Sequence, residues 1–156
     1  MIDALAIARA IHVLGVVHWI GGVAAVTTIV LPRARSLPDA EAAVAAFESF
    51  ERRFAPQARV SVLLTGLSGL YMLWQLDAWD RFRYAAFWSL HLMVALWVLF
   101  ALMLFVLEPL GIDRAFRAFA LRDKDRAFAL ATRLHAAALA IAAITIAAAV
   151  WSVSGG

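Results

Sequence analysis

The most informative absence in this sequence is cysteine, because it removes several kinds of chemistry at once. Without cysteine, the 156-residue chain has no disulfides, thiolate metal sites, cysteine-ligated iron–sulfur clusters or covalently attached c-type haem. Charged residues are also scarce, at 16% of the chain, and Lys124 is the only lysine. The sequence shows no hydrolase triad, phosphate loop or carboxylate dyad, and every acidic residue lies in a loop or at the end of an apolar stretch.

Apolar residues dominate what is present. They make up 65% of the chain, with a mean hydropathy of +0.85, whereas about half is usual for soluble domains. The sequence therefore indicates an integral membrane protein with a single domain, residues 1–156. The net charge of +3 and the pI near 10.2 do not indicate a nucleic-acid partner, because the basic residues lie beside apolar stretches, as topology signals do.

Four apolar stretches are long enough to cross a bilayer, which takes about 20 residues each. We predict spans at about residues 4–31, 58–76, 84–107 and 129–153. All must be helices, since open strands leave backbone groups unsatisfied in lipid. The predicted fold is an all-α, integral membrane four-helix bundle, and its first span is retained because it is too long for a cleaved signal. We expect the second helix to open after Pro56.

The distribution of basic residues predicts the orientation. Of the 14 Lys and Arg residues, only Arg9, Arg81 and Arg83 lie on the side of the termini; the others lie in or beside the two long loops. This puts both long loops in the cytoplasm and both termini on the outer, periplasmic side of a bacterial inner membrane. An aromatic belt is expected at the outer interface: Trp74, Trp79, Tyr84, Trp88 and Trp151.

Both long loops contain amphipathic patterns. After a helix start that we place at Ser36, the residues Val44, Phe47, Phe50 and Phe54 recur at helical spacing. The same pattern follows in the second loop with Ile112, Phe116 and Phe119. We expect these segments to lie on the membrane surface, with a partner-docking surface as the alternative.

Two histidines are expected at the same membrane depth. His12 lies nine residues after Asp3, about 13 Å along the first span, and His91 lies eight residues after Arg83, about 12 Å along the third. Histidine inside a membrane helix is costly and usually marks a site. An imidazole pair on facing helices indicates bis-histidine ligation of a b-type haem. Two histidines hydrogen-bonded to neighbouring helices would give the same pattern.

The residues that follow His12 suit a flat cofactor. Gly15, Trp19 and Gly22 share a helix face with His12, and the two glycines would leave room for a macrocycle beside the backbone. Close packing of two helices would explain the same glycines. An indole in mid-membrane, such as Trp19, would flank a cofactor ring or simply belong to the aromatic core.

Three arginines are candidates for binding a haem propionate. Arg9 lies one turn outward of His12 on nearly the same face, and Arg81 or Arg83 is the second candidate. Each would equally mark the membrane interface by snorkelling.

The other two histidines have weaker claims to a site. His18 is turned about 120° from His12 and lies about 9 Å deeper, so it cannot share a ligand edge with His12. It would act as a proton carrier or alternative ligand, or hydrogen-bond in the core. His135, two residues after Arg133, would be an interfacial residue, a second metal ligand or part of a proton exit.

The first span carries a motif that resembles known proteins. It contains His12, then His18-Trp19-Ile20-Gly21-Gly22, and ends at Leu31-Pro32-Arg33. This segment resembles the first helix of CopD-type copper-resistance membrane domains and HemJ-type protoporphyrinogen oxidases, which are small bacterial membrane proteins. The segments 54–59 and 66–71 resemble their second helix.

The resemblance implies a four-helix bundle that binds b-type haem, with His12 as the first-helix ligand. HemJ-type enzymes also use a lysine in the third helix, whereas Lys124 lies in a loop here and His91 would take that place as a ligand. Electron transfer between a quinone, or quinol, and an outer-face redox protein is the leading hypothesis. The alternatives are copper transport along His12, His91, Met93 and Met72, a HemJ-like oxidase, and a cofactor-free subunit of a respiratory assembly. We expect the protein to be surrounded by the lipid bilayer, and the sequence leaves open whether it forms a homo-oligomer.

Overall fold

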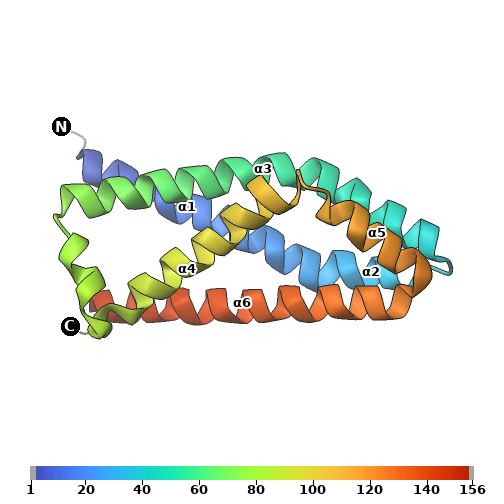
Figure 1. Cartoon of the computed structure of the whole chain (residues 1–156). Helices are drawn as coiled ribbons and strands as arrows, with labels where there is room; N and C mark the ends of the chain where they lie inside the picture. The colour runs from blue at the N-terminus through green and yellow to red at the C-terminus, as the bar shows by residue number, and fades with distance from the viewer. Residues whose placement is uncertain (1–2, 155–156) are drawn as a thin grey trace.

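All regular structure in the part of the chain that the computed structural model describes, residues 3–154, is helical. The elements, shown in Figure 1, are α1 (Ala4–Ala25), the π-helical turn η1 (Val26–Val30), α2 (Leu31–Arg35), α3 (Ala40–Gln75), the 3₁₀ turns η2 (Trp79–Arg83) and η3 (Ala85–Phe87), α4 (Trp88–Leu102), the π-helical turn η4 (Met103–Leu107), α5 (Ile112–Arg122) and α6 (Lys124–Ser154). The prediction of an all-α fold is confirmed for these residues.

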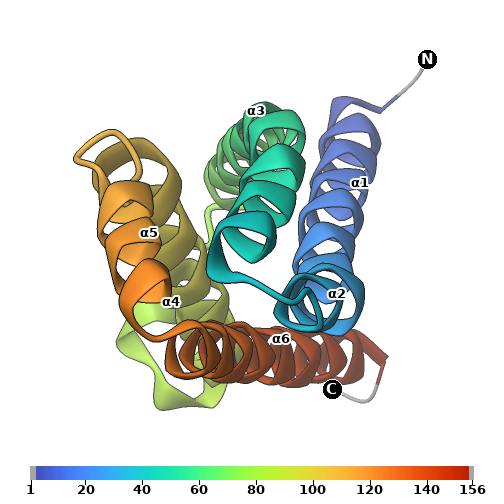
Figure 2. The ribbon, with the colours of Figure 1, turned by 90° about the vertical axis from the view of Figure 1, so that its right-hand side faces the viewer.

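The helices form an elongated bundle with two distinct ends (Figure 1). The terminal end holds the start of α1, the end of α3, the segment 76–87 and the end of α6. The basic end holds α2, the start of α3, α5 and the start of α6. Viewed from the basic end in Figure 2, α5 lies in front of α4 on one side of α3, α1 lies on the other side, and α6 runs across the lower part of the view.

Three helices of the described chain are long and apolar enough to cross a membrane: Ala4–Arg35, Ala85–Leu107 and Lys124–Trp151. They correspond to three of the four predicted spans. The first and the last extend further toward the basic end than predicted, because helical structure continues to Arg35 and begins at Lys124. The predicted second span, 58–76, corresponds to the second half of α3, which ends at Gln75 and is not among these three helices.

The expected break at Pro56 is wrong, because α3 runs through this residue without interruption. Proline removes one helical hydrogen bond and crowds the carbonyl four residues earlier, so an isolated helix would end or kink here. In this fold both halves of α3 are held by other helices: Val44 and Phe47 pack in one core, and Val62 packs in another. Tertiary packing thus overrides the local preference.

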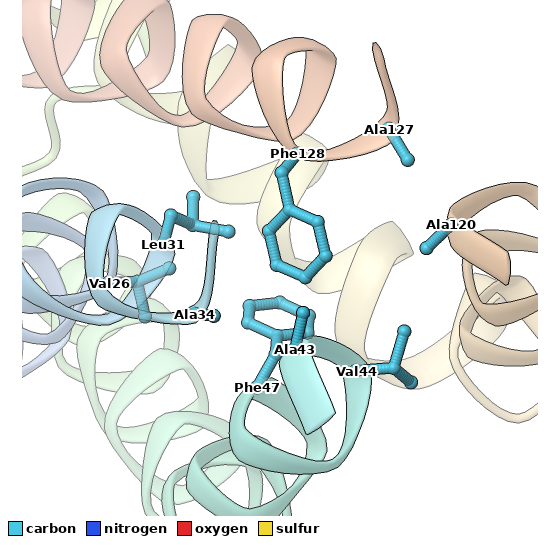
Figure 3. Close-up of a cluster of buried hydrophobic side chains, with 9 residues drawn as sticks. All are labelled: Val26, Leu31, Ala34, Ala43, Val44, Phe47, Ala120, Ala127 and Phe128. Atoms are coloured by element: carbon cyan, nitrogen blue, oxygen red, sulfur yellow. The ribbon is translucent and has the colours of Figure 1, made fainter. Parts of the chain in front are cut away.

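The basic end is closed by an apolar core to which α2, α3, α5 and α6 all contribute (Figure 3). Phe128 of α6 is fully buried, with its ring centroid 6.2 Å from that of Phe47 and 5.5 Å from that of Phe116. Leu31 and Val44 are also fully buried. The expectation that the first amphipathic segment lies on the membrane surface is therefore wrong, because its apolar face is covered by protein.

The second amphipathic segment, α5, is divided between two environments. Phe116 and Ala120 face the basic-end core, whereas Ile112 and Phe119 remain partly exposed. The helix starts at Gly111, whose positive φ of 94° suits glycine at a turn.

The connection between α2 and α3 is fixed by local and distant polar contacts. The helix start belongs to Asp39, whose carboxylate accepts a 2.6 Å hydrogen bond from the backbone N–H of Ala42, and not to Ser36 as predicted. Ser36 instead ends α2. Lys124 donates a 2.6 Å hydrogen bond from Nζ to the carbonyl of Leu37, so the only lysine joins this connection to the start of α6.

Candidate functional site

A cavity of about 490 Å³ lies between α1, α3, α4 and α6 in the half of the molecule nearest the terminal end. Its size falls within the range of small-molecule sites, about 300–1,000 Å³. Most of its wall is apolar, and the few polar groups therefore decide what it can hold. Those that bear on chemistry are His12, Trp19, Thr65, Arg81, Met72 and Met93.

His12 is fixed in orientation by α3. Its Nδ1 lies 2.9 Å from the backbone carbonyl of Thr65 and 3.3 Å from Oγ of Ser68. Because a carbonyl only accepts, Nδ1 carries the proton, and in the neutral ring Nε2 keeps its lone pair. No hydrogen bond to Nε2 occurs among the described residues. A backbone carbonyl that orients Nδ1 and leaves Nε2 free is the usual support of a metal-binding imidazole.

The approach of His12 to α3 depends on small residues. A Cβ atom at Gly69 would lie 3.2 Å from Cε1 of His12, so any larger residue would push against the imidazole. Thr65 and Ser68 are buried beside it. Thr65, Ser68 and Gly69 of α3 therefore place the ring.

Trp19 and Trp97 form part of the cavity wall and also pack inside the bundle. Trp19 is 4% exposed and meets Phe100 edge-on, with ring centroids 4.7 Å apart. Its Nε1 is buried and has no hydrogen-bond partner among residues 3–154. The Trp97 ring lies over Gly66, and its Nε1 donates a 2.8 Å hydrogen bond to the carbonyl of Val62.

Gly15 and Gly22 do not line the cavity. A Cβ atom at Gly15 would collide with the Thr65 side chain, and one at Gly22 would collide with the Phe54 ring. The room beside these glycines is filled by α3. Their place in the structure is therefore that of helix-packing residues, the second of the two interpretations given above.

His91 also lies outside the residues that line the cavity. Its Nδ1 is 2.9 Å from the carbonyl of Phe87, and its Nε2 is 3.1 Å from the carbonyl of Phe82. Both ring nitrogens thus face carbonyl oxygens. Ligation of a metal by His12 and His91 together would require His91 to leave at least one of these carbonyls.

The three arginine candidates separate clearly. Arg9 is exposed and makes no ion pair among the described residues. Neither Arg9 nor Arg83 lines the cavity. Arg81 does line it, and its guanidinium carbon lies 5.3 Å from the ring centroid of Phe87, a cation–π distance. Helical periodicity favours Arg9, whereas the path of the segment 76–87 distinguishes Arg81 from the other two candidates.

The remaining histidines have no part in this cavity. His18 is exposed, and its ring centroid lies 6.0 Å from that of Phe54. His135 is half-buried, with Nδ1 donating to the carbonyl of Ala131 at 2.9 Å. The described residues contain no group of three or more His, Cys, Asp or Glu side chains arranged to hold a metal ion.

A cluster of charged residues lies where α4 gives way to α5. Arg59 of α3 pairs with Glu108 at 2.8 Å, and Arg117 of α5 pairs with Glu48 at 3.0 Å. Burial, together with the charges of Asp113, Glu108 and Glu48, raises the pKa of Glu51 to about 8. Burial and Glu48 also raise the pKa of Asp113. The sequence marks these residues only as charged loop positions, and their proximity depends on the fold.

Comparison with known proteins adds no relative: no family model, curated protein or solved structure matches the chain.

Proposed function

We propose that this chain is a membrane b-type haem protein in which His12 ligates the iron from the wall of the cavity. The single observation that carries the proposal is the state of His12: Nδ1 is held by the Thr65 carbonyl, and Nε2 has no partner among the described residues. The resemblance of the first span to haem-binding membrane proteins supports the same assignment. When bound, haem supplies one-electron chemistry.

The other cavity residues fit such a group. The apolar wall suits a macrocycle, and Trp19, two turns further along α1 than His12, contributes an indole to the same wall. Arg81 provides a cation on the same wall that can pair with a propionate. In this proposal the protein's own residues bind and orient the cofactor and exclude water, and electron transfer joins a quinol to an outer-face acceptor.

The proposed setting is a bacterial inner membrane crossed by four helices, with residues 58–75 of α3 as the fourth span and both termini outside. A helix of 36 residues such as α3 is about 54 Å long, much more than the hydrocarbon core of about 30 Å. We place the inner boundary near Arg59 and Glu108, so the basic-end core projects into the cytoplasm. The excess of arginine at the basic end supports this orientation.

The test is an optical spectrum of the purified protein, oxidised and dithionite-reduced, with a pyridine haemochrome assay. We expect about one haem per wild-type chain, produced in cells with ample haem. His12→Ala should lose most of the haem, whereas His135→Ala, which alters a histidine outside the cavity, should retain it. A colourless wild-type protein, or full haem content in His12→Ala, would contradict the proposal.

A second candidate, copper handling, is favoured by one observation. Met72 and Met93 line the same cavity as His12, and thioether and imidazole groups are suitable ligands for cuprous copper. Metal analysis of the purified protein separates the two candidates, because copper without haem would replace the first proposal. A HemJ-like oxidation has less support, since Lys124 donates a hydrogen bond to Leu37 at the basic end and does not line the cavity, which lies nearer the terminal end.

A further inference from the structure

The segment 76–87 lies along the cavity at the terminal end. It consists of a bend at Asp77, with a positive φ of 47°, followed by the turns η2 and η3. Ala78, Arg81 and Phe87 of this segment contribute to the cavity wall. Ala78 is buried, with 3% of its surface exposed, so the segment packs against the bundle at this point.

His91 connects both turns of this segment to α4. Its Nδ1 reaches the carbonyl of Phe87 at the end of η3, and its Nε2 reaches the carbonyl of Phe82 within η2. The Phe82 ring also packs edge-on against the imidazole, with centroids 5.5 Å apart. An imidazole carrying a proton on each nitrogen donates to both carbonyls, and one carrying a single proton donates to one of them.

Arg81 directly precedes the first of these points of attachment in the chain and contacts the second. Phe82 is its neighbour in the chain, and the Phe87 ring lies under its guanidinium group at 5.3 Å. Both residues whose carbonyls face His91 therefore adjoin Arg81, one by sequence and one by contact. Loss of the imidazole would release the two groups that fix the direction of the Arg81 side chain.

We propose that His91 is a positioning residue that holds the segment 79–87 so that Arg81 binds the carboxylate of an anionic, planar ligand in the cavity. The ligand class rests on the proposed function. His91 acts through Arg81 and does not touch the ligand. The specificity of the cavity for carboxylate-bearing rings is then set by a contact outside the cavity wall.

The test compares ferric haem with its dimethyl ester, which keeps the ring and iron but lacks the two carboxylates. The wild-type protein in detergent should bind haem about tenfold more tightly than the diester, as one charge-assisted hydrogen bond allows. Arg81→Gln should abolish this preference. His91→Phe should reduce it while the absorption spectrum of bound haem stays unchanged. Arg83→Gln removes an equal charge from the same turn outside the cavity and should leave the preference intact.

Hydrogen exchange of the ligand-free proteins provides a second readout that needs no haem. Amides of residues 79–87 should exchange faster in His91→Phe than in the wild type, with unchanged exchange in the basic-end core. Unchanged exchange in this segment, an unchanged preference for haem over the diester, or loss of the wild-type haem spectrum in His91→Phe would each overturn the inference. If the wild type binds no haem, the proposed function fails, and exchange still decides whether His91 holds the segment.

Discussion

Both ends of the molecule are rich in apolar residues, but the surroundings of these side chains differ. At the basic end, Phe128, Leu31 and Val44 have exposed fractions of 0%. Nearer the terminal end, Leu14 and Leu67 are 68% and 63% exposed. Apolar composition alone therefore does not tell whether protein or lipid covers a side chain. In the proposed placement, protein covers the basic-end core and lipid covers the outer surface of the other half.

The largest expected effect is on the basic-end core. Phe128→Ala should lower the free energy of unfolding by about 3–5 kcal/mol, because a fully buried ring between Phe47 and Phe116 is replaced by a cavity. Leu14→Ala is the matched change on the exposed surface of α1 and should shift stability by about 0.5 kcal/mol or less. Thermal unfolding in one detergent measures both, and equal shifts would remove the contrast between the two halves.

A smaller effect is expected where α1 meets α3. Gly22→Ala should destabilise the protein by about 1–3 kcal/mol, because the new methyl group collides with the Phe54 ring, which stacks on Phe50 at 5.6 Å. Gly21→Ala adds the same methyl group where nothing lies within 4 Å and should be neutral or stabilising by up to about 1 kcal/mol. The same melting experiment measures both variants, and a similar loss of stability in both would contradict the assignment of the Gly22→Ala effect to contact with Phe54.

A further effect concerns the charged cluster between the two halves, and it depends on pH. The pKa of Glu51 is about 8 in the folded protein, above its ordinary value of 4.5. Between these values the folded state binds more protons than the unfolded state, so stability should fall as pH rises from about 5 to 8. Glu51→Gln should flatten this part of the stability profile and raise the melting temperature at pH 8. Glu41→Gln, on an exposed helix start, is the control, and an unaltered slope in Glu51→Gln would contradict the assignment.

Local sequence signals predicted where helices form better than they predicted which helices and side chains pack together. The apolar stretches around His12, Trp97 and Leu139 indicated helices long enough for a membrane, and all three of these helices are present. The sequence could not show that α3 passes through Pro56, because other helices supply the stabilisation that the proline removes. For the same reason Phe47 has a partner, Phe128, that lies 81 positions later in the chain.

The candidate site was predictable only where one residue type in one helix sufficed. The presence of histidine in apolar helices selected both His12 and His91, and of these two the structure places His12 on the cavity wall. The surroundings of His91 depend on two turns that fold back on the start of α4, and helical spacing carries no information about such turns. The choice of Arg81 over Arg9 depends on the same turns.

The two π-helical turns help to explain geometrically why apolar side chains are buried by protein at the basic end and exposed nearer the terminal end. Each π turn inserts one residue into the helical repeat, and one residue corresponds to about 100° of rotation. The turn η1 lies between α1 and α2, and it precedes Leu31 and Ala34 of α2, which are both buried in the basic-end core. The turn η4 follows α4 and ends just before Glu108. Removal of one residue from 26–30 would restore the α-helical phase and rotate Leu31 away from Phe128. A chain one residue shorter could therefore keep its composition and hydropathy and still lose this core.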